Sequence, residues 1–212
     1  MISFILLFAF LLYVKSLRIC VVGGSSSLGR EIIYQCICDY NIKVIGITDS
    51  PQKVCIPYRG SGLDDKSDKL NRIVDSKLKL ISYSDPIPKY YDAIIFSIGG
   101  TAFEKSDYSD EITKKYLDKI SNQCKSVILI SAYRVGNSIK NANIGIVSMR
   151  NWYLKDVYRA KEIQEKLVEN ITLLGVKKTI YRPKVLSYGD TSFESIPRQK
   201  LAKEIIENIL SR

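Results

Sequence analysis

One stretch near the N-terminus, Arg18 to Arg30, constrains the fold of this chain more than any other. Its sequence, RICVVGGSSSLGR, begins with five strand-like residues, passes through a turn rich in glycine and serine, and leads into a helical run that ends at Tyr40. A strand followed by a glycine turn and a helix start directs backbone N–H groups and the positive end of the helix dipole at one point. The stretch therefore predicts a phosphate-binding turn.

The turn follows the pattern G-x-x-G-x-x-G except that Ser26 stands at the middle glycine. Small residues leave room for a pyrophosphate to approach the backbone, and the last glycine lets the helix pack close to the strand. An acid, Asp49, lies twenty residues beyond Gly29, where the ribose-binding carboxylate of such sites is found. The residues expected to contact the phosphates are Gly23, Gly24, Ser25, Ser26, Ser27, Leu28 and Gly29.

Strand-like and helix-like segments alternate along the rest of the chain. The expected strands are 18–22, 43–48, 78–82, 92–98, 127–131 and 179–182. The expected helices are 28–40, 69–75, 111–124, 152–170 and 197–210. This alternation predicts an α/β protein with a doubly wound parallel sheet, the Rossmann fold, and helices on both faces.

The first residues of the chain form a separate apolar segment. Residues Ile2 to Val14 are apolar apart from Ser3, and Lys15 follows them. This run is shorter than the roughly 20 residues of a spanning helix and fits the apolar core of a secretory signal, about 7 to 15 residues. A signal peptide, a short membrane anchor, the start of a bipartite organelle signal and an apolar helix packed on the domain are the alternatives. We expect 1–16 to be a targeting signal or anchor for an organelle (mitochondrion or plastid) or the secretory pathway, and 17–212 to be one nucleotide-binding domain.

Composition excludes several kinds of site. The chain has 32 Lys+Arg against 22 Asp+Glu, a net charge of +10, spread without a basic run. With no recognisable nucleic-acid module, this excess suits an anionic cofactor, an acidic membrane surface or an acidic partner better than nucleic acid. A solvated lysine-rich surface is the alternative that the scattered charges favour. The absence of histidine excludes imidazole catalysis, and five cysteines without a C-x-x-C pair argue against a zinc site, so no metal site is expected.

Four stretches together resemble the atypical short-chain dehydrogenases/reductases: Val21–Arg30, Tyr91–Gly100, Val127–Ala132 and Asn151–Gly189. The last contains NWYLKDVYRAKEIQEKLVEN and TIYRPKVLSYG, which are similar to the family's helix with a lysine followed four residues later by glutamate, then a strand that ends in Arg-Pro and a Tyr-Gly. The chain most resembles the group that contains the nucleotide-binding accessory subunit of mitochondrial complex I and relatives in quinone biosynthesis and plastids. Only Asp190–Arg212 follows the Tyr-Gly, which implies a minimal C-terminal substrate lobe.

The resemblance implies a nicotinamide dinucleotide as cofactor and assigns positions to it. Asp49 falls where the adenosine ribose is recognised, unless it is only a solvated aspartate at the end of a strand. A carboxylate there accepts hydrogen bonds from both ribose hydroxyls and repels a 2′-phosphate, so we expect NAD in preference to NADP. Asp85 resembles the acid that meets the adenine amine, although a turn aspartate is the alternative. The remaining positions implied to line the cofactor are Ile98, Gly99, Lys161 and Pro183.

The catalytic positions match the family less well. Its conventional pair is a tyrosine with a lysine four residues later on one helix face, where the ammonium lowers the tyrosine pKa. Lys161 aligns with the lysine, but Val157 stands at the tyrosine position and Tyr158 is its neighbour. The helper hydroxyl falls near Ala132, and Ser131 stands one residue before it. The implied catalytic candidates are therefore Lys161, Tyr158 and Ser131, with the conventional pair broken.

Two functions are compatible with these residues, and a degenerate domain that binds nothing is a third, weaker interpretation. The first is a dinucleotide-binding protein with weak or no conventional dehydrogenase chemistry, acting as an accessory or assembly factor for a membrane complex or quinone pathway. The second is an NAD(P)-dependent oxidoreductase, or an epimerase/dehydratase-like enzyme, acting on a small or lipidic carbonyl. The missing tyrosine and the short distal lobe favour the first, and both require the phosphate turn and Asp49.

Overall fold

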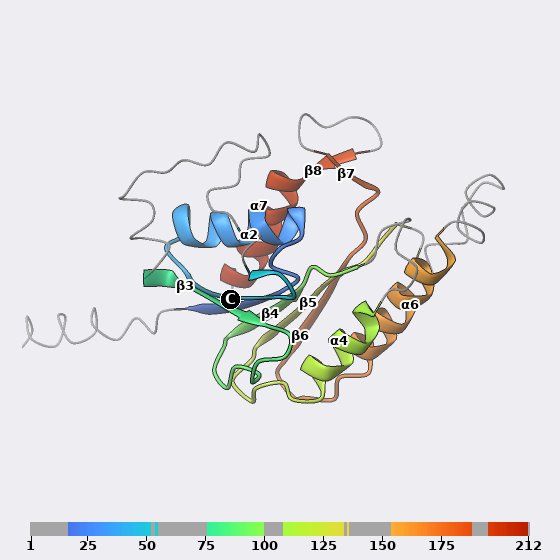
Figure 1. Cartoon of the computed structure of the whole chain (residues 1–212), viewed down its shortest axis with the longest axis horizontal. Coiled ribbons are helices and arrows are strands. Elements are labelled where there is room, and N and C mark those ends of the chain that lie inside the picture. The colour runs from blue at the N-terminus through green and yellow to red at the C-terminus, as the bar shows by residue number, and fades with distance from the viewer. Residues whose placement is uncertain are drawn as a thin grey trace, which may run out of the picture.

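The computed structural model describes residues 17–51, 54, 76–99, 108–133, 135, 154–187 and 195–211. Figure 1 shows a sheet of parallel strands with helices packed on both sides. The strands of this sheet are β1 (Arg18–Val22), β2 (Lys43–Thr48), β3 (Leu78–Ser82), β4 (Ala93–Phe96), β5 (Ser126–Ile130) and β6 (Lys177–Tyr181). The helices are α2 (Ser27–Cys38), α4 (Ser109–Leu117), α6 (Lys155–Glu169) and α7 (Arg198–Leu210). Two short strands, β7 (Val185–Ser187) and β8 (Ser195–Pro197), form a separate parallel pair.

The strand order of the main sheet is β3-β2-β1-β4-β5-β6, and every neighbouring pair is parallel. The chain builds outward from β1 to β3, returns to the other side of β1 and continues outward through β6. The carboxyl ends of β1 and β4 therefore mark the point where the order reverses, which is where open α/β sheets bind their ligands. The prediction of a doubly wound parallel sheet, the Rossmann fold, is confirmed.

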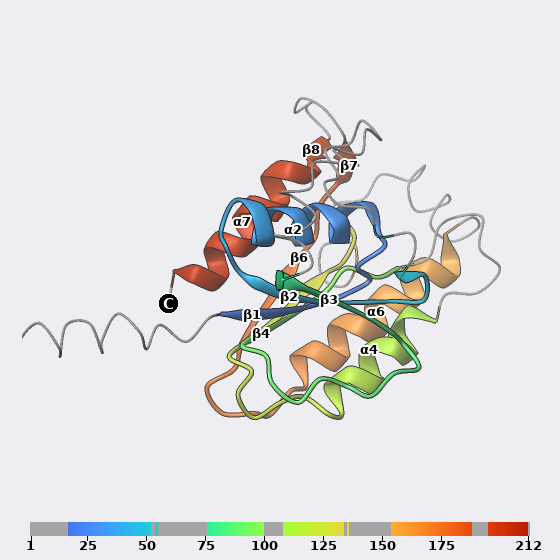
Figure 2. The same cartoon turned by 60° about the vertical axis from the view of Figure 1, so that its left-hand side comes forward.

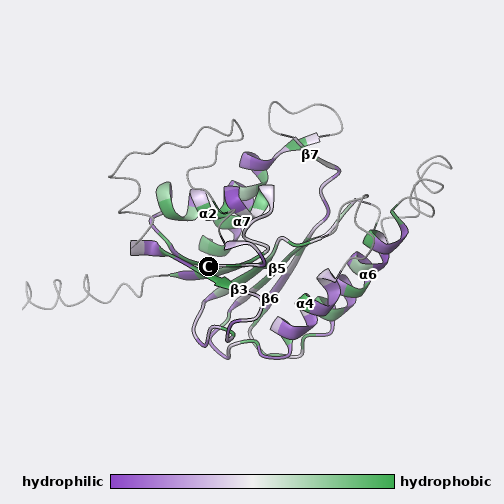
Figure 3. Ribbon diagram, in the orientation of Figure 1, coloured by the Kyte–Doolittle hydropathy of each residue, from purple (hydrophilic) through white to green (hydrophobic). Residues whose placement is uncertain are grey.

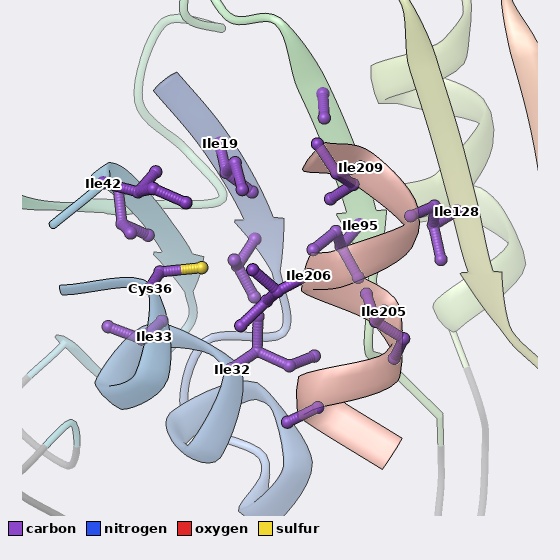
Figure 4. Packing of buried hydrophobic residues seen from close by; sticks show 14 of the residues in the cluster. Ile19, Ile32, Ile33, Cys36, Ile42, Ile95, Ile128, Ile205, Ile206 and Ile209 are labelled. Atoms are coloured by element: carbon purple, nitrogen blue, oxygen red, sulfur yellow. The ribbon is translucent and has the colours of Figure 1, made fainter. Parts of the chain in front are cut away.

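Two helix layers cover the sheet, as the edge-on view in Figure 2 shows. Alternate residues of a strand point to opposite faces, so Ile19 and Val21 pack in the cluster that contains α2 and α7, while Cys20 and Val22 pack in the cluster on the other face. Figure 4 shows isoleucines of α2, of α7 and of β1, β4 and β5 packed in the first cluster. Helices α4 and α6 cover the second face, and both mix hydrophobic and hydrophilic residues along their length (Figure 3). Helices thus cover both faces of the sheet, and the strands β1, β2, β4 and β5 are more deeply buried than the outer strands β3 and β6.

The bounds of β1, β2 and β3 agree with the sequence prediction, but several others differ. The helix expected over 111–124 ends at Leu117, because the hydroxyl of Ser121 accepts a hydrogen bond from the Gln123 amide in a local turn that competes with helix. The strand expected over 92–98 covers Ala93–Phe96, those expected over 127–131 and 179–182 begin one and two residues earlier, and β7 and β8 were not predicted.

Two expected segments, 1–16 and 69–75, lie outside the described residues. Within the described part of the chain, no helix has the length and apolar character needed to cross a bilayer.

Candidate dinucleotide site

The phosphate turn leaves β1 at Gly23, whose φ of 87° lies in the left-handed region that favours glycine. The amides of Gly23 and Gly24 both donate to the Ile47 carbonyl, at 2.8 and 3.0 Å, and so tie the turn to β2. A Cβ on Gly23 would lie 2.4 Å from both the Ser97 carbonyl oxygen and Ile98 Cγ2. No side chain fits there, so this glycine sets the path of the backbone between β1 and β4.

Ser26, the residue in place of the middle glycine, caps helix α2. Its backbone is extended (φ −65°, ψ 154°), its amide donates to the Gly23 carbonyl at 3.0 Å, and its Oγ accepts from the Gly29 amide at 2.9 Å. A Cβ on Gly29 would lie 2.2 Å from the Gly23 carbonyl oxygen, which confirms the close approach of helix and strand. The serine therefore fixes the start of the helix while keeping the turn small.

Hydroxyl groups from the ends of two strands, β2 and β4, hold the turn in place. Ser26 Oγ lies 3.0 Å from Ser97 Oγ, just beyond β4, and Thr48 Oγ1 at the end of β2 donates to Ser25 Oγ at 2.6 Å. Thr48 also contacts Asp49 Oδ1 at 3.2 Å. Sequence reasoning missed Ser97 and Thr48, although each is a polar residue at the carboxyl end of a buried strand and could have been found on that ground.

The two predicted acidic residues occupy different surroundings. Asp49 is exposed at the carboxyl end of β2, one residue beyond the hydroxyls that anchor the turn. Asp85 Oδ2 accepts a hydrogen bond from the Ser82 amide at 2.6 Å, so part of this carboxylate stabilises the turn after β3. Asp49 is thus exposed among the described residues and Asp85 has a structural role in its turn, while the roles of both toward the adenosine stay predictions.

Two tyrosines that the sequence did not single out join this region. Burial raises the pKa of Tyr83, and the negative charge of Asp49 raises it further, which places this phenol beside the expected ribose position. Burial, Cys20 and Asp85 raise the pKa of Tyr116 to about 12, and its buried hydroxyl has no hydrogen-bond partner. Both phenols are therefore neutral at physiological pH, and Asp49 and Asp85, the two acids predicted at the adenosine end, each contribute to one of these pKa shifts.

Lys161 lies at the opposite end of the site, at the carboxyl ends of β4 and β5. Its side chain is buried, and Nζ donates to the Ile98 carbonyl and, at 2.9 Å, to the Ile130 carbonyl. A Cβ on Gly99 would lie 2.9 Å from Lys161 Cε. The structure thus brings Ile98, Gly99 and Lys161 together, and their contact with a cofactor stays a prediction.

The other catalytic candidates, Ser131 and Tyr158, are linked to the segment that follows β5. Ser131 Oγ is buried and has no hydrogen-bond partner, although its backbone amide donates to the Tyr181 carbonyl at 2.8 Å. Tyr158 Oη donates to the Tyr133 carbonyl at 3.2 Å. The Pro183 carbonyl accepts from the Tyr133 amide at 3.1 Å, which holds the segment after β6 against the segment after β5.

A buried ion pair joins the Lys161 helix to β6. Arg182 Nε and Nη2 donate to the two carboxylate oxygens of Glu165, both at 2.9 Å, and the Glu165 side chain is 5% exposed against 33% for Arg182. The hydrogen bonds that Arg182 donates to Glu165 raise the pKa of Arg182. Because Glu165 lies one turn after Lys161, this pair fixes the orientation of the helix face that carries the lysine.

No cluster of three or more His, Cys, Asp or Glu side chains suited to a metal ion occurs among the residues that the structure describes. The site at the carboxyl end of the sheet is instead built from backbone amides, hydroxyls, one exposed carboxylate and one buried ammonium. This donor set suits a phosphorylated, polyhydroxyl ligand.

Comparison with known proteins shows which solved structures have a similar fold. No protein-family model and no curated protein matches the chain. Among solved structures, a short-chain dehydrogenase/reductase from Veillonella parvula in complex with NADP is 11% identical, with a TM-score of 0.63 over 92% of this chain and 88% of that one. A putative NAD-dependent epimerase/dehydratase from Bacillus halodurans is 15% identical (TM-score 0.62; 91% and 87% covered). The anaerobillin reductase ChuY from Escherichia coli O157:H7 is 12% identical (TM-score 0.61; 90% and 89% covered). The chain therefore has the Rossmann fold of these reductase and epimerase structures.

Proposed function

We propose that this protein binds NAD across the carboxyl ends of β1, β2, β4 and β5. The observation that carries the proposal is the turn at Gly23, where a positive φ leads from the strand into a serine-capped helix at the point of strand-order reversal. The pyrophosphate would lie at the N-terminus of α2, the adenosine ribose beside Asp49, and the nicotinamide toward Lys161. The NADP in one of the similar structures supports the class of cofactor.

We further propose that the protein works without the conventional tyrosine–lysine hydride chemistry. Val157 has no proton to donate, the Tyr158 hydroxyl is bonded to the Tyr133 carbonyl, and Lys161 donates to two backbone carbonyls. A general acid must lie within hydrogen-bond reach of the group it protonates and have its proton available, whereas the Tyr158 proton is taken up by the Tyr133 carbonyl. This supports an accessory or assembly role for a membrane complex or a quinone pathway, with the dinucleotide as a bound ligand.

One observation favours a second candidate, an NAD(P)-dependent oxidoreductase. The buried Ser131 hydroxyl has no partner and follows Ile130, whose carbonyl accepts from Lys161. An unsatisfied buried hydroxyl costs about 1–3 kcal/mol and is retained where a ligand can pair with it. A substrate carbonyl would pair with it directly.

Exchange of Asp49 for arginine is expected to reverse the choice of nucleotide. In the wild-type chain, Asp49 accepts charge-assisted hydrogen bonds from the ribose, about 1.5 to 3 kcal/mol, and repels a 2′-phosphate. NAD should therefore bind about tenfold or more tightly than NADP at low salt. Isothermal titration of both nucleotides into wild type and Asp49→Arg measures this.

The control is Asp39→Arg, which makes the same charge change at the exposed far end of α2. It should leave the nucleotide preference unchanged. A wild-type chain that prefers NADP, or that binds neither nucleotide, would contradict the assignment of Asp49.

Turnover assays separate the two candidate functions. With NADH and a panel of small and lipidic carbonyls, we expect the wild-type chain to oxidise cofactor no faster than the buffer does, while binding it. Tyr158→Phe should leave binding unchanged, because its hydroxyl is already bonded to the Tyr133 carbonyl. Turnover that is lost in both Ser131→Ala and Lys161→Ala would establish the oxidoreductase instead.

A further inference from the structure

A cavity of about 400 Å³ opens at the amino ends of the strands, on the side of the sheet away from the dinucleotide site. It lies between the starts of β1, β2 and β3 and the segment that precedes β4. The strands between the two sites are about five residues long, roughly 17 Å at 3.3 Å per residue. The cavity is therefore separate from the dinucleotide site.

The lining of this cavity is strongly basic. Its cationic residues are Arg18, Lys43, Lys77, Lys79 and Lys89, and no aspartate or glutamate is among the described residues that line it. Cations from four separate segments thus converge on one hollow. Like charges held this close repel one another, so the arrangement favours an anionic ligand between them.

Two of these cations, Lys77 and Arg18, donate hydrogen bonds to neutral groups. Lys77 Nζ donates to the side-chain oxygen of Asn41, and Arg18 Nη1 donates to the Tyr90 carbonyl at 3.4 Å. The carboxylate of Asp92 is nearby, but its Oδ2 accepts from the Arg18 backbone amide at 3.0 Å and does not line the cavity. Among the described residues that line the cavity, no carboxylate offsets this positive charge.

Two apolar features accompany the charge. The ring of Tyr90 is 58% exposed at the cavity, and the inner wall includes Val44 and Leu78. Tyrosine at a surface rich in lysine is typical of membrane–water interfaces, where the ring sits at the headgroups. A free inorganic anion needs neither an exposed ring nor an apolar wall.

The sequence before β1 indicates that the ligand of this cavity belongs to a membrane. The apolar run that ends at Val14 stops four residues before Arg18, a distance of at most about 14 Å of extended chain. A basic cluster beside an apolar segment gives the two signals that stable attachment to an acidic membrane requires. Nucleic acid would use the charge but has no use for the apolar run.

We propose that this basic cavity seats the phosphate of an acidic phospholipid and so docks the amino ends of the strands on a membrane surface. The dinucleotide site then faces away from the membrane, at the other end of the sheet. This inference goes beyond the proposed function, because it concerns a different surface and a different ligand.

Vesicle flotation of the full-length chain tests the proposal. The chain should bind phosphatidylcholine vesicles that contain phosphatidylserine more tightly than pure phosphatidylcholine vesicles, with a steep loss at high salt. The variant Lys43→Gln/Lys79→Gln/Lys89→Gln should bind the acidic vesicles about 100-fold more weakly, at about fivefold for each lysine removed.

The matched control is Lys114→Gln/Lys119→Gln/Lys166→Gln, which removes the same charge from exposed lysines outside the cavity. It should change vesicle binding much less. Equal losses in the two triple variants would overturn the proposal, since net charge alone would then explain binding. NAD affinity should be the same in the cavity variant and wild type, so failure of either proposal can be recognised separately.

Two further measurements distinguish other anions. Inorganic phosphate should not raise the melting temperature of the wild-type chain, and duplex RNA should bind both triple variants equally. A phosphate-dependent stabilisation that disappears in the cavity variant would assign the cavity to a free anion and overturn the membrane assignment. Selective loss of RNA binding in that variant would overturn it in favour of nucleic acid.

Discussion

Gly23→Val is expected to lower the affinity for NAD by about 100-fold or more. Valine at φ 87° is strained, and its Cβ would lie 2.4 Å from the Ser97 carbonyl oxygen, so the turn must move away from β4. That movement displaces the α2 N-terminus from the phosphates, and loss of two charge-assisted hydrogen bonds would cost at least about 3 kcal/mol. Isothermal titration of the purified variant with NAD measures the effect.

A second glycine provides the matched control for strain. Gly175 has a similar φ of 78° but no atom within 4 Å of an added Cβ, and it lies before β6, at the other end of the sheet. Gly175→Val should therefore cost about 1–3 kcal/mol of stability and leave NAD affinity unchanged.

Ser27→Asp keeps the prediction testable if Gly23→Val does not fold. Ser27 is the first residue of α2, which has no acidic residue in its first turn, so a carboxylate there should stabilise the helix while repelling the pyrophosphate. A stable Ser27→Asp chain that binds NAD as tightly as wild type would remove the turn from the site.

Arg182→Met is expected to cause the largest loss of stability, about 3 kcal/mol in the free energy of unfolding. The substitution leaves the carboxylate of Glu165 buried without its bidentate partner, and such removal typically costs about 3–5 kcal/mol. We place the loss at the lower end because the Arg182 side chain is one-third exposed. Urea denaturation followed by circular dichroism measures it.

The exposed pair Lys203–Glu207, with N and O atoms 3.8 Å apart, is the control. Lys203→Met should cost less than about 0.5 kcal/mol, because exposed i,i+4 pairs contribute little. The double variant Arg182→Met/Glu165→Met should recover much of the loss, since no buried charge remains. A double variant as unstable as Arg182→Met would show that packing, and not the unpaired carboxylate, causes the loss.

The sheet was largely predictable because its strands are apolar runs with clear ends. In both the prediction and the structure, β2 begins at Lys43 and ends at Thr48, and β1 begins at Arg18 and ends at Val22. By contrast, β7 and β8 are three residues each, too short for the two-residue period of a strand to be visible. The end of α4 was missed because the turn at Ser121 depends on a hydrogen bond that helical periodicity does not register.

The candidate site was predictable only in part. The N-cap formed by Ser26 could have been predicted, because serine is a preferred residue directly before a helix. The neighbours of Lys161 depend on β4 and β5 being adjacent, and the contact between Thr48 and Ser25 depends on β2 lying beside β1. Such contacts follow from strand order, which a local pattern of residues does not specify.

Helix α7 completes the hydrophobic cluster that contains α2, so the domain cannot finish folding during synthesis before α7 has been made. Gln35 Nε2 donates to the Gln199 carbonyl across 164 positions of sequence, and Ile32 of α2 packs in one cluster with Ile206 of α7. A nascent chain therefore carries the uncovered apolar face of α2 until residues near 209 have left the ribosome, a state that attracts chaperones and is prone to aggregate. Contacts of such long sequence separation also form slowly. The phosphate turn accordingly rests on a layer that is completed only when α7 packs against α2, so cofactor loading should report on chains in which α7 is in place.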